Sequence, residues 1–311
     1  MQDRLCFVQF LHPGGEHGPD TPGFKGWTRG WHKRKYLRST GSVFVDGHMH
    51  QGEIEFWGEW EAQSEVESIE TPIVEGPHWI HRPFWSPPAS YRDLQNTDPF
   101  VFGDRFHYTG CLQYTRYGPT QLRNLARGSV ILFGSNRGRS NFVVDTVFVV
   151  ADHVDHSLRD YKRTLDGVVS ETYAAVTLAP WYASLVGCNT PDRDRSYRLY
   201  LGAPVDNPID GMFSFFPCWP ASASTQGFAR PSLRIPGVIT PTMTQNKRLN
   251  PRQSIGAITP LWDEVVRQVM SQGLTLGIHA DLPRNICADA DAQDAGAVTR
   301  SRSGCPAARP R

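Results

Sequence analysis

Two apolar runs rich in β-branched and aromatic residues, at residues 129–133 and 142–150, constrain the fold of this chain more than any other feature. Residues 134–141, which separate them, are Gly, Ser, Asn and Arg, all common in turns. This pattern predicts a β-hairpin. Successive side chains of a strand point to opposite faces, and both faces of the second run are apolar. We therefore expect a central strand that is covered on both sides.

Asp145 is the only charged residue in the second run. Removing a carboxylate from water costs several kcal/mol, so an aspartate on a buried strand needs a partner. The favoured interpretation is structural, with Asp145 paired to an arginine or a loop amide. The alternative is a carboxylate that belongs to a functional site.

The frequent prolines and glycines, 24 and 28 of 311 residues, imply many short elements joined by turns. Further apolar strands are predicted at residues 4–11 and 53–60. One helix is well indicated, at residues 259–273, where Pro260 stands in the first turn and an apolar stripe follows. We therefore predict an α+β fold with a mostly antiparallel, strongly curved or barrel-like sheet and few helices.

A chain of 311 residues is long enough to bury a large core. We expect a single globular α+β domain at residues 1–287. Residues 75–88 and 217–260 are rich in proline, and we expect them to be long loops that cover this domain. Residues 288–311 are mostly Ala, Asp, Arg and Gly, with few side chains that could join a core, and we expect a disordered tail.

The charges nearly cancel, with 32 Lys and Arg against 31 Asp and Glu, so no overall field favours nucleic acid or a membrane surface. The six cysteines form no C-x-x-C pair, which argues against a zinc ribbon and a disulfide framework. No apolar stretch approaches the ~18 residues of a membrane span, and the N-terminus lacks a signal-peptide pattern. We expect a cytoplasmic protein with reduced thiols and no membrane partner.

The sequence contains none of the P-loop, dinucleotide-binding, α/β-hydrolase or zincin motifs, so it identifies no cofactor. His48 and His50 would share one side of an extended segment, as two metal ligands do. No third ligand stands near them in the sequence, and we assign no metal site.

The strongest functional signal is a block of basic and aromatic residues within residues 21–45, which contain no acidic residue. Cations displace counterions from a phosphate backbone, and flat rings stack on bases. The first hypothesis is therefore a nucleic-acid or nucleotide binding module. The residues assigned to it are Lys25, Trp27, Arg29, Trp31, His32, Lys33, Arg34 and Lys35, with Trp57 added because the alternation of residues 53–60 predicts that it faces outward among glutamates.

A structural explanation of the basic block competes with this hypothesis. Residues 51–75 contain eight glutamates and no Lys or Arg. The two blocks would neutralise each other if they faced one another across a sheet.

The second functional hypothesis is a hydrolase that acts on a nucleotide or another phosphorylated substrate. The strand predicted at residues 4–11 ends in a turn that presents His12, Glu16 and His17. Loops positioned by rigid strand ends often carry catalytic groups. His12 or His17 would act as general base or acid, Glu16 would orient it, and Asp145 would supply a second carboxylate. The sequence alone does not decide between an enzyme and a binding module.

Overall fold

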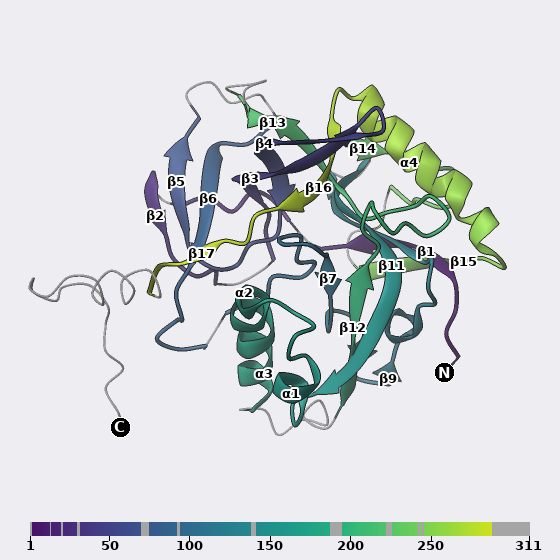
Figure 1. The fold of residues 1–311 in the computed structure, drawn as a ribbon, viewed down its shortest axis with the longest axis horizontal. Coiled ribbons are helices and arrows are strands. Elements are labelled where there is room, and N and C mark those ends of the chain that lie inside the picture. The colour runs from purple at the N-terminus through teal and green to yellow at the C-terminus, as the bar shows by residue number, and fades with distance from the viewer. Residues whose placement is uncertain are drawn as a thin grey trace, which may run out of the picture.

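The computed structural model describes residues 2–12, 14–19, 21–29, 32–69, 75–91, 94–137, 141–186, 195–221, 226–241, 243 and 246–287. Two large sheets make up most of this part of the chain, and a few helices flank them (Figure 1). The predicted tail at residues 288–311 lies outside the described residues.

The first sheet is built around the predicted hairpin. β10 (Val130–Arg137) and β11 (Asn141–Ser157) pair in antiparallel register, and β1 (Cys6–Leu11) runs parallel to β10. The sheet has the order β15-β1-β10-β11-β12-β7, and β14 also pairs with β11. Its other strands are β7 (His107–Tyr108), β12 (Ser196–Gly202), β14 (Ser232–Leu233) and β15 (Asn246–Pro251).

Both faces of this sheet are buried, as predicted for the central hairpin. On one face, Phe148 belongs to the same apolar cluster as Phe56 of the second sheet, so this face packs where the two sheets meet. On the opposite face, Val147 belongs to a cluster that includes Trp262 of α4 (Thr259–Ser271), the predicted helix. Each fully buried side chain of this size stabilises the fold by about 1.5–3 kcal/mol.

The second sheet has eight strands in the order β16-β13-β4-β3-β6-β5-β2, with β17 paired to β6. β16 pairs with both β13 and β3, so the sheet curls at this end. Its strands are β2 (Gly23–Lys25), β3 (Lys35–Val45), β4 (His48–Gly58), β5 (Ser64–Ser68), β6 (Trp79–Trp85), β13 (Phe216–Pro220), β16 (Thr275–Ala280) and β17 (Arg284–Asn285). A small separate hairpin joins β8 (Tyr114–Thr115) and β9 (Gly118–Pro119).

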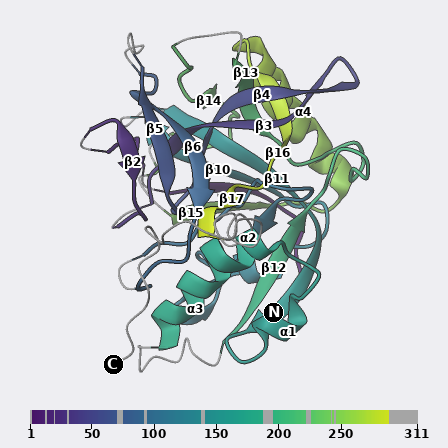
Figure 2. The same ribbon diagram turned by 60° about the vertical axis from the view of Figure 1, so that its left-hand side comes forward.

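The helices lie at two places around the sheets. α1 (Tyr161–Thr164), α2 (Glu171–Tyr173), the π-helical turn η2 (Ala174–Leu178) and α3 (Ala179–Val186) gather near β12, and α4 lies on the other side of the molecule (Figures 1 and 2). Two short 3₁₀ turns are η1 (Gln121–Asn124) and η5 (Ile255–Ala257). None of the helices in the described part of the chain is long and apolar enough to span a membrane.

The structure corrects three predictions about this architecture. The fold is sheet-rich with few helices, but both sheets mix parallel and antiparallel pairs and neither is a closed barrel. Residues 75–88 are not only a cover loop, since they contain the inner strand β6. Residues 217–260 contain strands of both sheets.

Candidate active site

Buried polar side chains gather where the two sheets meet. His12 follows β1, Arg34 precedes β3, Glu59 follows β4, and Asp145 lies on β11. All four are at most 3 % exposed. Ion pairs and hydrogen bonds join them into one connected cluster.

A β-bulge positions Asp145 within this cluster. The register between β10 and β11 shifts after Phe133, so Asp145 has no partner across the ladder. Bulges re-aim a side chain that would otherwise follow the regular alternation. Gly134 suits the bulge because a Cβ there would lie 2.1 Å from the carbonyl oxygen of Val143.

Asp145 is held by two arginines. Arg34 Nε lies 2.6 Å from Asp145 Oδ2, and Arg34 Nη1 lies 2.9 Å from Glu59 Oε2. Burial alone would lower the pKa of Arg34, but the neighbouring carboxylates of Asp145 and Glu59 raise it. Arg230 adds a longer contact of 3.5 Å to Asp145 Oδ1. This is the structural pairing that the sequence favours for an aspartate on a buried strand.

His12 connects Glu59 to a cysteine. Its Nδ1 lies 2.9 Å from Glu59 Oε2, and its Nε2 lies 3.2 Å from Cys111 Sγ. Burial favours the neutral ring by lowering the pKa of His12. Burial opposes ionisation of Glu59, but the neighbouring His32, His12 and Arg34 hold the pKa of this carboxyl below its usual range. The ionised Glu59 therefore accepts the Nδ1 proton of His12, which leaves the Nε2 lone pair facing the thiol of Cys111.

Cys111 lies in a tight turn after β7. Gly110 and Leu112, on either side of it, have positive φ values of 72° and 57°. The Cys111 N–H donates to Thr109 O at 2.8 Å. Burial raises the pKa of the Cys111 thiol well above its usual value, and the carboxyls of Asp98 and Glu59 add to this effect. The thiol is therefore protonated at rest, beside a neutral imidazole that can accept its proton.

A cavity of about 310 Å³ opens at Cys111. Its walls include three aromatic rings, two amides and one guanidinium. These residues are Tyr114, Trp181, Tyr197, Gln95, Asn96 and Arg195. The cysteine of the cluster is thus within reach of a small molecule.

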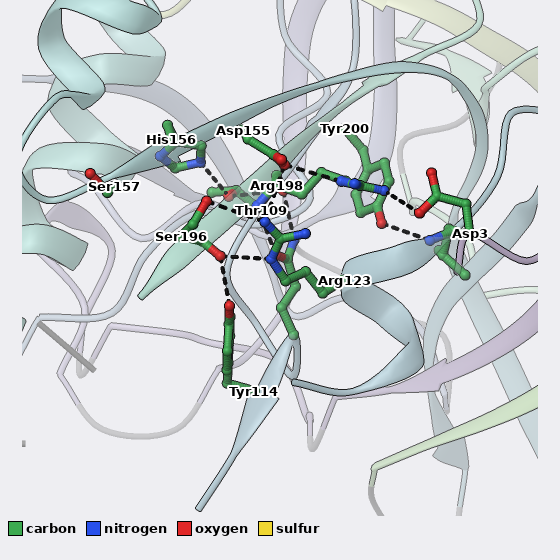
Figure 3. Close-up of polar contacts among 12 residues, drawn as sticks. Asp3, Thr109, Tyr114, Arg123, Asp155, His156, Ser157, Ser196, Arg198 and Tyr200 are labelled. Atoms are coloured by element: carbon green, nitrogen blue, oxygen red, sulfur yellow. Dashed lines mark hydrogen bonds and ion pairs between the residues drawn. The ribbon is translucent and has the colours of Figure 1, made fainter. Parts of the chain in front are cut away.

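Hydrogen bonds from β12 hold the turn that carries Cys111 (Figure 3). Arg198 O accepts from Thr109 Oγ1 at 3.2 Å and from Gln113 Nε2 at 2.6 Å. His156 Nε2 lies 2.9 Å from Thr109 Oγ1 (Figure 3). The Arg198 guanidinium contacts Asp155 at 3.1 Å and Asp3 at 2.9 Å, which fixes β12 in turn (Figure 3). The Cys111 turn is therefore anchored on both sides of the thiol.

Two of the predicted catalytic residues lie outside the cluster. Glu16 does not orient a catalytic histidine, because its carboxylate accepts the backbone N–H groups of His78 and Trp79 at 2.8 and 2.9 Å and pairs with the ring of His78. Burial and the nearby cations Lys25, Lys35 and Lys33 lower the pKa of His17 to about 3. Of the predicted group, His12 and Asp145 are brought together.

The predicted basic block is divided between interior and surface. Arg34 and Lys35 are buried, and Lys35 Nζ donates to Ala62 O at 2.8 Å. Lys25 and Trp27 are half-buried, and Arg29 and Lys33 are exposed. Trp31 lies outside the described residues.

The indole of Trp57 is buried, although the sequence predicts that it faces outward. It is 4 % exposed, and its Nε1 donates to Phe228 O at 2.7 Å. The alternation that placed it outside does not apply, because β4 has buried residues on both faces at this end, including Glu55. The two charge blocks also pair, since Arg38 lies 2.6 Å from Glu55 and His32 lies 2.7 Å from Glu59.

Sequence analysis does not assign Cys111, Glu59 or Glu61 to a site. Cys111 has no local motif, and Glu59 and Glu61 are two of the eight glutamates of one segment. The donor atoms of His32, Glu59 and Glu61 lie within 4.8 Å of one another, and these are the described residues that could hold a metal ion. No protein-family description, curated protein or solved structure matches this chain.

Proposed function

We propose that this protein is a hydrolase that uses Cys111 as its nucleophile. The observation that carries the proposal is the position of His12, whose ring nitrogens contact Cys111 Sγ at 3.2 Å and Glu59 Oε2 at 2.9 Å. A nucleophile, a base and a group that orients the base are the parts of a hydrolytic triad, and they are recognised by geometry rather than by order in the sequence.

The chemistry follows from the protonation states. As Cys111 Sγ attacks a carbonyl carbon, its proton passes to His12 Nε2, and Glu59 stabilises the imidazolium that forms. The C–N or C–O bond of the substrate then breaks, and His12 returns the proton to the leaving group. Water attacks the resulting thioester with His12 as its base, which releases a carboxylic acid and restores the thiol.

The cavity at Cys111 favours a small planar substrate that carries negative charge. Trp181 and Tyr197 offer ring faces for stacking. Arg195 brings a guanidinium, the group best suited to bind phosphate, and its Cζ lies 4.7 Å from the centre of the Tyr114 ring. We propose an acylated nucleotide, or a related phosphorylated molecule with an amide or ester bond, as the substrate class.

The nucleic-acid hypothesis has less support from the positions of its residues. Arg34 and Lys35 are buried among polar partners, and Trp57 is buried by the segment around Phe228. Binding to nucleic acid stays a prediction that would depend on the exposed cations Arg29 and Lys33.

Labelling of the full-length protein with chloroacetamide tests the triad directly. The alkylation of Cys111, followed by mass spectrometry, should slow at least tenfold in His12→Gln, because general-base assistance is typically worth about 10²–10⁴-fold. Cys287, which is half-buried and follows β17 of the second sheet, is the internal control and should react equally in both proteins.

A panel of nucleotides and related phosphorylated molecules that carry an amide or ester bond, followed by product analysis, tests the activity. Turnover should be abolished in Cys111→Ala and retained in Cys287→Ala. Turnover that survives Cys111→Ala, or equal labelling of Cys111 with and without His12, would overturn the proposal.

A further inference from the structure

Glu61 is a buried carboxylate that the fold itself does not use. It is 1 % exposed, and neither of its carboxylate oxygens has a hydrogen-bond partner among the described residues. Its backbone is already fixed, since its N–H donates to Thr97 Oγ1 at 2.9 Å and its carbonyl accepts from Thr28 N at 2.7 Å. A buried ionisable group without a partner costs several kcal/mol, so this side chain requires an explanation.

An ion pair with the nearby Lys35 does not account for the burial of Glu61. The ammonium of Lys35 is buried nearby, but it donates to Ala62 O at 2.8 Å. Burial lowers the pKa of Lys35 to about 7, against the opposing effect of the Glu61 charge, so the ammonium is only partly charged near neutral pH. The contact from Glu61 to His32 Nδ1 is a long one of 3.5 Å.

Donor atoms of two other side chains lie near the Glu61 carboxylate. Glu59 Oε2 is occupied by His12 and Arg34, whereas Glu59 Oε1 faces His32 Nδ1 at 2.7 Å. The donor atoms of His32, Glu59 and Glu61 all lie within 4.8 Å of one another. His32 is 20 % exposed and lies on the solvent side of the two buried glutamates.

We propose that His32, Glu59 and Glu61 form a binding site for a divalent first-row transition-metal cation. One imidazole and two carboxylates are the ligand types of zinc, manganese and iron sites. Neighbouring ligand atoms about 2.0–2.2 Å from a common ion lie about 3.0–3.6 Å apart. His32 Nδ1 lies 2.7 Å from Glu59 Oε1 and 3.5 Å from Glu61 Oε1, so an ion would replace the proton between His32 and Glu59, and these two atoms would move apart by a few tenths of an ångström.

Charge also favours a cation at this position. Arg34 is shared between Asp145 and Glu59, and Arg230 also contacts Asp145, so Glu61 is the buried carboxylate of this group that no arginine of the described residues contacts. Burial raises the pKa of Glu61, and the negative charge of Glu59 raises it further against the opposing effect of His32. Burial disfavours the charged ring of His32, but Glu59 and Glu61 raise its pKa to about 10. A dication would displace this proton, satisfy both carboxylates and take the neutral His32 ring as its third ligand.

The metal site does not rest on the thiol chemistry. It uses Glu59 Oε1, whereas the triad uses Glu59 Oε2. In the described part of the chain, Cys111 Sγ is hydrogen-bonded to His12 and to none of the proposed ligands. Binding of a metal can therefore be measured without any substrate.

The test is titration of chelator-treated, full-length protein with Zn²⁺ by calorimetry and with Co²⁺ by visible absorption. Wild type should bind one equivalent, and its melting temperature should rise with Zn²⁺. Glu61→Gln and His32→Gln should each weaken binding at least tenfold. Glu65→Gln, the same change at an exposed glutamate on β5, should bind as wild type does.

Two further measurements distinguish the loss of a metal ligand from unfolding of the variant and from metal binding at another site. Without metal, Glu61→Gln should melt at or above the temperature of wild type, because an unpartnered carboxylate has been replaced by a neutral amide. Cys111→Ser should bind Zn²⁺ normally. A wild type that binds no equivalent of either metal, a Glu61→Gln protein that binds equally well, or loss of binding in Cys111→Ser would overturn the proposal.

Discussion

Asp145 is a carboxylate on a strand whose other described side chains between Phe142 and Val150 are buried and mostly apolar. Its charge is tolerated there because Arg34 and Arg230 both contact it. We predict that Asp145→Leu lowers the free energy of unfolding by about 3–5 kcal/mol, since the buried Arg34 would lose its closest carboxylate partner. Urea unfolding would measure the loss.

Asp152→Leu is the matched control for this substitution. Asp152 lies on the same strand but is exposed, and in the described part of the chain its Oδ1 accepts the N–H of the next residue, His153. We expect a change within about 0.5 kcal/mol. Equal effects of the two substitutions would show that the ion pairs of Asp145 contribute nothing to stability.

The need of Asp145 for a partner could be predicted from the sequence, but the identity of the triad could not. A charge on an apolar strand must be paired whatever the fold, and this follows from solvation alone. Cys111 and His12 stand 99 residues apart, and neither lies in a motif that predicts the other. Their contact depends on how β7 and β1 are placed in the first sheet, which is a property of the whole topology.

At the scale of elements, the turn between β7 and β8 is the most constrained segment of the candidate site. Gly110 has a φ of 72°, and a Cβ there would lie 1.2 Å from the Trp181 ring of α3. We predict that Gly110→Ala is destabilising and that it also changes the rate at which Cys111 is alkylated, because Trp181 must move away from the cavity wall.

Gly167→Ala isolates the packing contribution in this prediction. Gly167 has nearly the same φ, of 70°, but no atom lies within 4 Å of the Cβ that would be added. Both variants carry backbone strain, so their difference measures the clash with Trp181, which we expect to be about 1–3 kcal/mol. Thermal melts of both variants give this difference. Equal melting temperatures would mean that the Trp181 ring moves aside with no loss of stability.

Elements with strong local patterns were predictable, whereas the inner strand β6 was not. The hairpin of β10 and β11 and the helix α4 are indicated by apolar periodicity and turn residues. β6 contains Pro83, which argues against an inner strand. The strand tolerates this proline because its pairing with β3 involves only Ile80 and His81, before Pro83 is reached.

At the scale of the whole molecule, strand order is set by contacts between distant segments. β15 pairs with β1 although more than two hundred residues separate them, and β16 closes on β3 in the same way. Such pairings depend on which edges remain open after the local hairpins have formed, and no local pattern reports this. This strand order produces the boundary between the two sheets where the candidate site lies. The sequence therefore suggests a catalytic role for His12 and Asp145 and phosphate binding for Arg34, but no role for Glu59 or Cys111.

Buried neutral histidines make the stability of the whole molecule sensitive to acid. Burial lowers the pKa of His156 and of His107 to about 4 in each case. In the unfolded chain a histidine has a pKa of about 6.5. Between these values the unfolded chain binds protons that the folded protein does not, so stability is complete above about pH 6.5 and falls as the pH drops towards 4.

His156 allows this dependence to be tested at one position. Its ring contacts Tyr182 and Thr109, and Asp160, Asp155 and Arg123 are the charges that influence it. A shift from about 6.5 to about 4 should cost about 2 kcal/mol of stability at pH 5 relative to pH 7.5. We predict that, between pH 7.5 and pH 5, the free energy of unfolding of His156→Gln falls by about 2 kcal/mol less than that of wild type. This difference should hold whatever the stability of the variant at pH 7.5.

The measurement is urea unfolding of wild type, His156→Gln and His48→Gln at several pH values between 5 and 7.5. His48 is exposed at the start of β4, so its replacement should leave the dependence on pH as it is in wild type. The comparison uses the slope of stability against pH, which removes any loss of packing that is the same at every pH. A His156→Gln protein with the slope of wild type would mean that His156 takes up its proton in the folded state as readily as in the unfolded chain, and that its burial beside Tyr182 and Thr109 does not exclude the charged ring.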